Sequence, residues 1–109
     1  MDKIKLDGHH PLVDGVIRRN ITTYYESRKL KVPDDQEALL YLVSEIGELA
    51  DAFVDSKSDD WVRNNSKYRS ISDEVADVLM MLYVFSMQRN LNPYNCLVDK
   101  MKRKIEELK

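Results

Sequence analysis

Apolar residues that recur at steps of three and four positions limit what this chain can fold into, because that spacing lines one side of an α-helix. Only three glycines and three prolines occur among the 109 residues, and the prolines fall where helices would begin or break. The sequence therefore predicts an all-α fold, a four-helix bundle forming a single domain. The four helical segments are 12–29, the stretch after Pro33 as far as 55, 70–90 and 93–108, and residues 1–11 are expected to form a mobile N-terminal segment.

Capping residues mark where these helices start. Asp34 is followed three positions later by Glu37, the spacing of a capping box, in which each side chain hydrogen-bonds to the backbone N–H of the other residue. Ser70 stands before the third segment, and Asn92 stands before Pro93, which suits the first position of a helix. These signals predict helices that begin just after Asp34, Ser70 and Asn92.

Two pairs of acidic residues interrupt the apolar stripes. Glu45 lies on the stripe of the second segment, so it is expected to point inward, and Glu48 follows three positions later. The third segment is apolar on nearly every side, which predicts a central, buried helix, yet Glu74 and Asp77 stand three apart within it. Burying a carboxylate is costly unless a cation or hydrogen bonds replace its lost hydration. The expected stripe of the second segment is Leu39, Leu42, Ile46, Leu49 and Phe53.

Packed side by side, the second and third helices would direct four carboxylates at one cavity. Their mutual repulsion is relieved by protonation or by a bound divalent cation. Ligands that are all oxygen atoms select a hard ion, which predicts Mg²⁺ as the cofactor, with Mn²⁺ as its substitute. A di-iron site would need Glu-x-x-His pairs, and the only histidines, His9 and His10, lie outside the helices. The remaining alternative is a bundle whose acids are simply solvated.

The sequences around these acids resemble a known family. "EIGE" at 45–48 and, after 25 intervening residues, "EVAD" at 74–77 are similar to the ExxE and ExxD signature of the MazG-like all-α nucleoside triphosphate pyrophosphohydrolases. The flanking stretches "LVSEIGELADAF" and "DEVADVLMMLYVFS" resemble the family's motif helices, and the resemblance covers about 13–108. It implies a MazG-like bundle packed as a homodimer or tetramer.

The resemblance also implies an activity and a set of metal ligands. Glu45, Glu48, Glu74 and Asp77 would hold Mg²⁺, and a metal-activated water would split a ribo- or deoxyribonucleoside triphosphate into the monophosphate and pyrophosphate. Such a hydrolase would remove unwanted nucleotides from the cellular pool, a house-cleaning role. Among the four acids Glu48 is the candidate general base, because it lies in the middle of the group.

Basic residues near the end of the chain are candidates for binding the phosphates. Lys100 matches a lysine that many MazG-like relatives carry, whereas Lys104 stands where those relatives have asparagine. Arg103 and Lys104 are further candidates for phosphate contacts. A basic last turn also complements the helix dipole, so a solvated role for these two residues remains open.

The stretch 56–69 is polar and without periodicity, which predicts a loop. It contains Trp61, the only tryptophan, and any nucleobase can stack on an aromatic ring, so Trp61 is the candidate base-stacking residue. Packing against the protein is the alternative role of this side chain.

The charge of the chain narrows the choice of partners. The net charge is −2 and a third of the residues are charged with both signs, which argues against nucleic acid as a partner. No apolar run reaches the ~20 residues that cross a bilayer, and "MDKIKLDGHH" lacks the apolar centre of a signal peptide, so neither a membrane partner nor export is expected. With Cys96 as the single cysteine, a cytoplasmic protein is expected.

Two other functions stay open on the sequence alone. One is an enzyme like phosphoribosyl-ATP pyrophosphohydrolase, which has a similar fold and acidic motifs. The other is a helical interaction module without catalytic activity.

Overall fold

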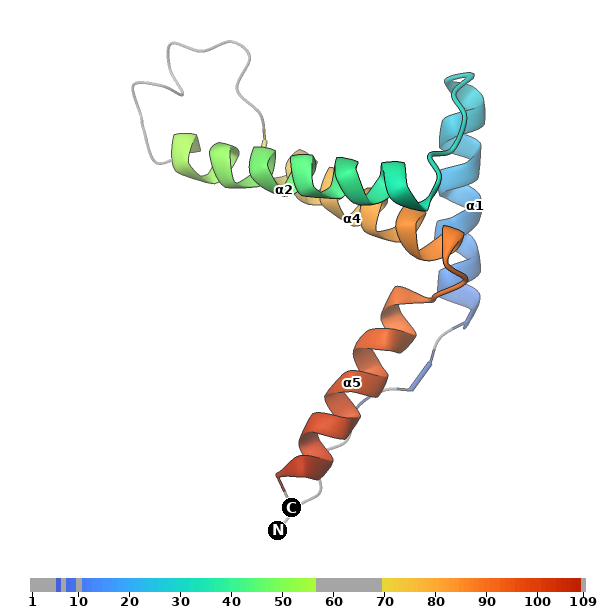
Figure 1. The fold of residues 1–109 in the computed structure, drawn as a ribbon, viewed down its shortest axis with the longest axis vertical. Helices are drawn as coiled ribbons and strands as arrows, with labels where there is room; N and C mark the ends of the chain where they lie inside the picture. Colours follow the sequence, from blue (N-terminus) through green and yellow to red (C-terminus); the bar gives the residue numbers. More distant parts are fainter. Residues whose placement is uncertain (1–5, 7, 10, 57–69, 109) are drawn as a thin grey trace.

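The fold is that of a computed structural model, which describes residues 6, 8–9, 11–56 and 70–108. These residues contain four helices and no strand: α1 (Pro11–Ser27), α2 (Asp35–Ser56), α4 (Ile71–Gln88) and α5 (Pro93–Glu107) (Figure 1). The expected all-α fold is therefore confirmed for the described part of the chain. Each helix end lies within two residues of the expected position.

The helix starts follow the expected capping chemistry. The backbone N–H of Glu37 donates to Asp34 Oδ1 at 2.8 Å and the N–H of Asp34 donates to Glu37 Oε1 at 3.1 Å, which completes the capping box. Ser70 Oγ and Asn92 Oδ1 each accept a hydrogen bond from the backbone N–H three residues further on, at 3.4 and 3.1 Å. These contacts fix where α2, α4 and α5 begin.

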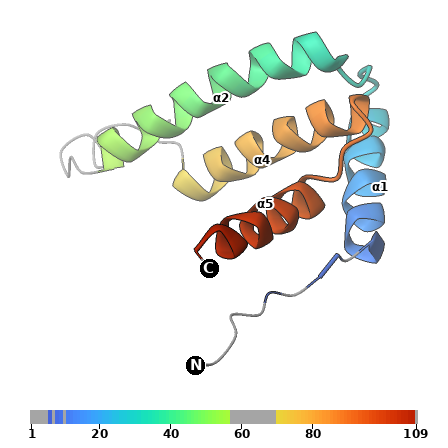
Figure 2. The same cartoon turned by 60° about the horizontal axis from the view of Figure 1, so that its bottom comes forward.

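α2 and α4 lie side by side and run in opposite directions, and α1 crosses the pair where α2 begins and α4 ends (Figures 1 and 2). α5 leaves the same end of α4 through a short turn and diverges from the α2–α4 pair. That turn contains Asn90 in the left-handed conformation, with φ 56°, which asparagine tolerates better than most residues. α4 is in contact with each of the other three helices.

The hydrophobic core lies where α1 crosses α2 and α4. Val84 and Ala38 are fully buried at its centre. The buried core residues are Ile21, Tyr25, Ala38, Met81, Tyr83 and Val84.

The expected stripe of α2 was right in part. Leu42 and Leu49 are half-buried, but Leu39, Ile46 and Phe53 are about half exposed in the single chain. The fully buried positions are instead the small residues Ala38 and Ala52, because small side chains let α2 approach α4 closely. The larger apolar side chains of α2 consequently form an outer surface that a single chain does not cover.

Similar exposure appears on α4 and α5. α4 is the central helix, as expected, but Val75 and Leu79 are each 50% exposed, so a single chain buries it only in part. On α5, Val98 is buried while Leu97 faces solvent, as does Leu108 directly after the helix. Because Leu12 and Val13 of α1 are exposed too, all four described helices retain uncovered apolar area.

The described part of the N-terminal segment 1–11 is attached to the bundle. His9 Nε2 lies 2.9 Å from Asp99 Oδ1 of α5, within hydrogen-bonding distance. Pro11 already belongs to α1. The expected mobility of residues 1–5, 7 and 10 concerns positions outside the described residues.

Candidate metal centre

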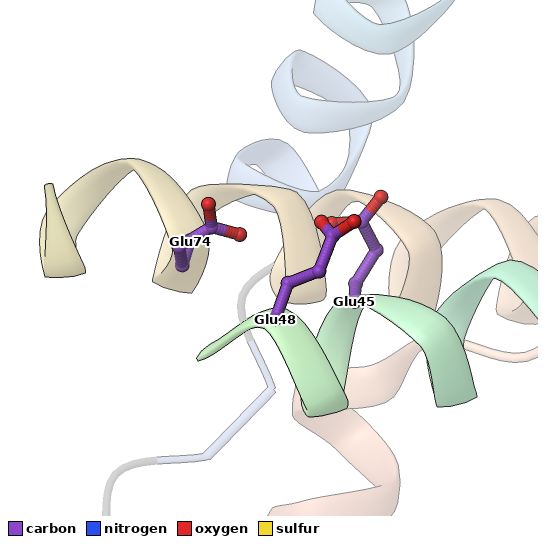
Figure 3. A group of neighbouring side chains, drawn as sticks. All are labelled: Glu45, Glu48 and Glu74. Atoms are coloured by element: carbon purple, nitrogen blue, oxygen red, sulfur yellow. The ribbon is translucent and has the colours of Figure 1, made fainter. Parts of the chain in front are cut away.

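Three glutamates meet between α2 and α4. Each of Glu45, Glu48 and Glu74 offers one carboxylate oxygen, and these oxygens all lie within 4.8 Å of one another (Figure 3). Glu74 on α4 is only 3% exposed, and the two glutamates of α2 are half-buried. We call these three residues the acid cluster. The separation of its oxygens suits ligands that share one or two cations.

The local sequence explains why the cluster forms. Residues three apart on a helix lie about 60° apart around its axis, so Glu45 and Glu48 both face α4. Because α2 and α4 run antiparallel and in contact, Glu74 in the first turn of α4 can lie opposite the pair, as Figure 3 shows. The expectation that Glu45 points inward is borne out by its half-buried position.

The electrostatic environment of Glu45 is unfavourable to its charge. The pKa of Glu45 is raised to about 7, and the largest cause is burial. The hydrogen bond with Glu48 and the charge of Glu48 come next, followed by the charges of Asp77 and Glu74. In addition, Glu45 Oε2 is buried and accepts no hydrogen bond from the described residues. A buried carboxylate oxygen without a donor, among negative charges, is an arrangement that a bound cation would complete.

Asp77, the fourth expected ligand, lies at the edge of the cluster. Its side chain is half-buried on α4, and its charge is one of those that raise the pKa of Glu45. Its oxygens are not among those that lie within 4.8 Å of one another. The structure thus brings three of the four expected ligands together and places the fourth nearby.

The three basic residues expected at the phosphates stand apart from the acid cluster. Lys100, Arg103 and Lys104 are exposed on α5, which diverges from the α2–α4 pair. Lys104 Nζ forms an exposed ion pair with Glu107, at 3.2 Å. The charges that act on Glu45 include none of these three residues. Within one chain the structure therefore does not bring them to the cluster.

Trp61, the expected base-stacking residue, lies outside the described residues. The structure instead shows Tyr25 of α1 near the acid cluster. Its pKa is raised by burial, by the neighbouring Tyr24 and Tyr41, and by Glu45. No local pattern in the sequence singles out Tyr25 for this position, because its closeness to Glu45 depends on how α1 crosses the other helices.

Comparisons with models of protein families, with curated proteins and with solved structures find no match for this chain. Among the described residues, no helix is long and apolar enough to cross a membrane.

Proposed function

We propose that this chain is a MazG-like, Mg²⁺-dependent nucleoside triphosphate pyrophosphohydrolase that cleaves ribo- or deoxyribonucleoside triphosphates to the monophosphate and pyrophosphate. The observation that carries the proposal is the acid cluster, with Glu74 buried and the pKa of Glu45 raised to about 7. The resemblance of "EIGE" and "EVAD" to the family signature supports it. The role would be house-cleaning of the cytoplasmic nucleotide pool.

The donor set fits the expected metal. Carboxylate oxygens from two helices match the preference of Mg²⁺, and of Mn²⁺ in its place, for hard ligands. When bound, the cation would neutralise the triphosphate and lower the pKa of the attacking water. Glu45, Glu74 and Asp77 would hold it, and Glu48 would both contribute an oxygen and take the proton from the water.

We also propose that the working form is a homodimer or tetramer. On α2, Val43 and Phe53 are more than half exposed, and on α5 the same holds for Leu97. Apolar surface of this kind on several helices is typical of chains that pack against further copies. A second copy would also offer a route by which Lys100, Arg103 and Lys104 reach the phosphates of a neighbouring site.

The deciding experiment measures pyrophosphate release from a panel of ribo-, deoxyribo- and modified nucleoside triphosphates and from phosphoribosyl-ATP. Each substrate is tested with Mg²⁺, with Mn²⁺ and with a chelator. We expect metal-dependent formation of a nucleoside monophosphate and pyrophosphate. Cleavage of phosphoribosyl-ATP alone would move the proposal to that related activity. If neither metal supports any cleavage and Mg²⁺ leaves the melting temperature unchanged, the non-catalytic module is the better description.

A further inference from the structure

A groove of about 330 Å³ lies between α1 and α4, on the α1 side of the bundle. Its walls are mostly apolar and include Ile17 from α1 and Leu79 and Met80 from α4. Among the residues that line it, Asn20, Tyr24 and Tyr83 carry polar groups. A concave site of about 300 Å³ or more, with apolar walls and a few polar groups, has the usual character of a small-molecule site.

The two helices that line the groove also carry residues near the acid cluster. On α4, Ala76 lines the groove and directly precedes Asp77, while Met80 follows Asp77 by three positions, about 60° around the helix axis. On α1, Tyr24 lines the groove and its neighbour Tyr25 is close enough to Glu45 to be affected by its charge. A ligand bound at the acid cluster would have to extend past Asp77 and around α4 to enter the groove.

The chemistry of the groove suits a nucleobase. A base has flat apolar faces, which the aliphatic walls can cover, and an edge of donors and acceptors, which an asparagine amide can match because it carries both. The guanidinium of Arg28 lies 5.6 Å from the centre of the Tyr24 ring. This places a positive charge beside Tyr24, one of the residues that line the groove.

We propose that this groove binds the base of the nucleoside triphosphate whose phosphates bind at the acid cluster, and that Asn20 hydrogen-bonds to the edge of that base. The inference rests on the proposed function, which supplies the nucleotide and its orientation. Asn20 and Tyr24 are thereby assigned as specificity-determining residues.

The first test separates substrate binding from chemistry in a nucleoside triphosphate assay. Asn20→Ala and Tyr24→Ala are expected to raise KM by tenfold or more for the preferred substrate and to leave kcat within about threefold, since tenfold corresponds to the loss of about 1.4 kcal/mol of binding. Thr23→Ala, an exposed position on the same helix, is the matched control and should leave KM unchanged. Unchanged KM in both groove variants would overturn the assignment.

Asn20→Asp sharpens the same test. The substitution keeps the shape of the side chain and removes its donors. The ranking of the bases by kcat/KM should therefore change, rather than kcat/KM falling by the same factor for every base. A uniform loss over all bases would argue that Asn20 acts on something other than the base.

A second test does not require catalysis. Adenosine, guanosine, cytidine and thymidine 5′-monophosphates are titrated in the presence of a chelator while the side-chain amide of Asn20 and the backbone amide of Ala76 are followed by NMR. For at least one of the four monophosphates we expect chemical-shift changes at these two amides. These changes should be smaller in Tyr24→Ala. No shift there, or shifts confined to other surfaces, would overturn the inference.

The two tests keep this inference apart from the proposed function. Metal-dependent cleavage with unaltered KM in the groove variants would overturn the groove and leave the enzyme standing. Binding of monophosphates in the groove without any cleavage would overturn the enzyme and leave the groove as a nucleotide site. If Asn20→Ala or Tyr24→Ala instead changes the mass of the protein in light scattering, the groove is an interface between copies and the inference falls.

Discussion

Within the described part of the chain, carboxylates are withdrawn from solvent both on α1 and between α2 and α4, and their surroundings differ. On α1, the side chain of Asp14 is 14% exposed and its Oδ2 lies 2.7 Å from Nε of Arg18, one turn later. Arg18 also donates to the carbonyl of Leu91 at 2.7 Å, so the pair ties α1 to the turn before α5. Between α2 and α4, by contrast, the charges that act on Glu45 are all negative.

The difference separates a structural ion pair from a candidate binding site. At Asp14 the chain supplies the cation itself, and the result is a fixed contact between two parts of the fold. At Glu45 the fold holds like charges together, which raises the free energy of the cation-free state. Such an arrangement is typical of sites whose partner comes from solution.

The largest effect is expected from removing one acid near the cluster. Glu48→Gln or Asp77→Asn should lower turnover of nucleoside triphosphates by at least about 100-fold, because each change removes a metal ligand or the proton acceptor. Without metal, the melting temperature should be equal to or higher than that of the unmodified chain, since repulsion with Glu45 falls. Steady-state kinetics and thermal unfolding measure the two quantities.

The matched control is Asp73→Asn, at an exposed acid in the first turn of α4. It removes one negative charge from the helix that carries Asp77 and should keep turnover within about twofold. Full activity in both Glu48→Gln and Asp77→Asn would end the assignment of the site.

The next effect concerns the other region. Arg18→Met leaves Asp14 largely buried without its cation and frees the carbonyl of Leu91, so we expect a loss of about 1–2 kcal/mol in the free energy of unfolding. Chemical denaturation with and without Mg²⁺ measures it. The Mg²⁺-induced stabilisation should be the same as in the unmodified chain. A reduced response to Mg²⁺ would show that the two regions are coupled, and the contrast between them would then be invalid.

Addition of Mg²⁺ should stabilise the unmodified chain by a similar or smaller amount. At a free concentration ten times the dissociation constant, binding to the folded state contributes about 1.4 kcal/mol. Glu74→Gln, which removes the most buried charge of the cluster, should lose most of this gain, whereas Asp73→Asn should keep it. Sodium chloride at equal ionic strength controls for screening. Equal gains in all three proteins would place the cation elsewhere.

Local sequence predicted the helices because their ends depend on contacts three residues apart, as in the Asp34 and Glu37 capping box. The rotation of α2 was predicted less well. Its apolar residues extend over more than one side, and close packing on α4 favours small Ala38 and Ala52 over the larger Ile46. Side-chain size alone therefore indicated the wrong face for part of the helix.

In the candidate site, too, local sequence predicted some features, whereas others depend on how the helices pack. The pairing of Glu45 with Glu48 follows from spacing on one helix, so sequence was sufficient for it. The position of Asp77 at the edge of the cluster depends on how α2 and α4 are rotated against each other. The separation of Lys100 from the cluster depends on the direction that α5 takes after the turn at Asn90. No local pattern encodes these two outcomes.

The smallest effect is a dependence of stability on pH in the absence of metal. The ordinary pKa of a glutamate, 4.5, applies to Glu45 in the unfolded chain, whereas its pKa in the fold is about 7. Between these values the folded state retains a proton that the unfolded state has released. The contribution of Glu45 to stability is therefore fully present below pH 4.5 and is lost as the pH rises to about 7.

Glu45→Gln is uncharged at every pH, so it should become more stable relative to the unmodified chain as the pH rises from 5 to 7.5. Because Glu45 is only half-buried, we expect a relative gain of about 1 kcal/mol or less. Denaturant unfolding of both proteins with a chelator, at several pH values, gives this difference directly. Asp14→Asn provides the comparison from the other region. A stability difference between Glu45→Gln and the unmodified chain that stays constant over this range would mean that the carboxylates around Glu45 do not oppose its charge, and the acid cluster would then resemble the Asp14 region.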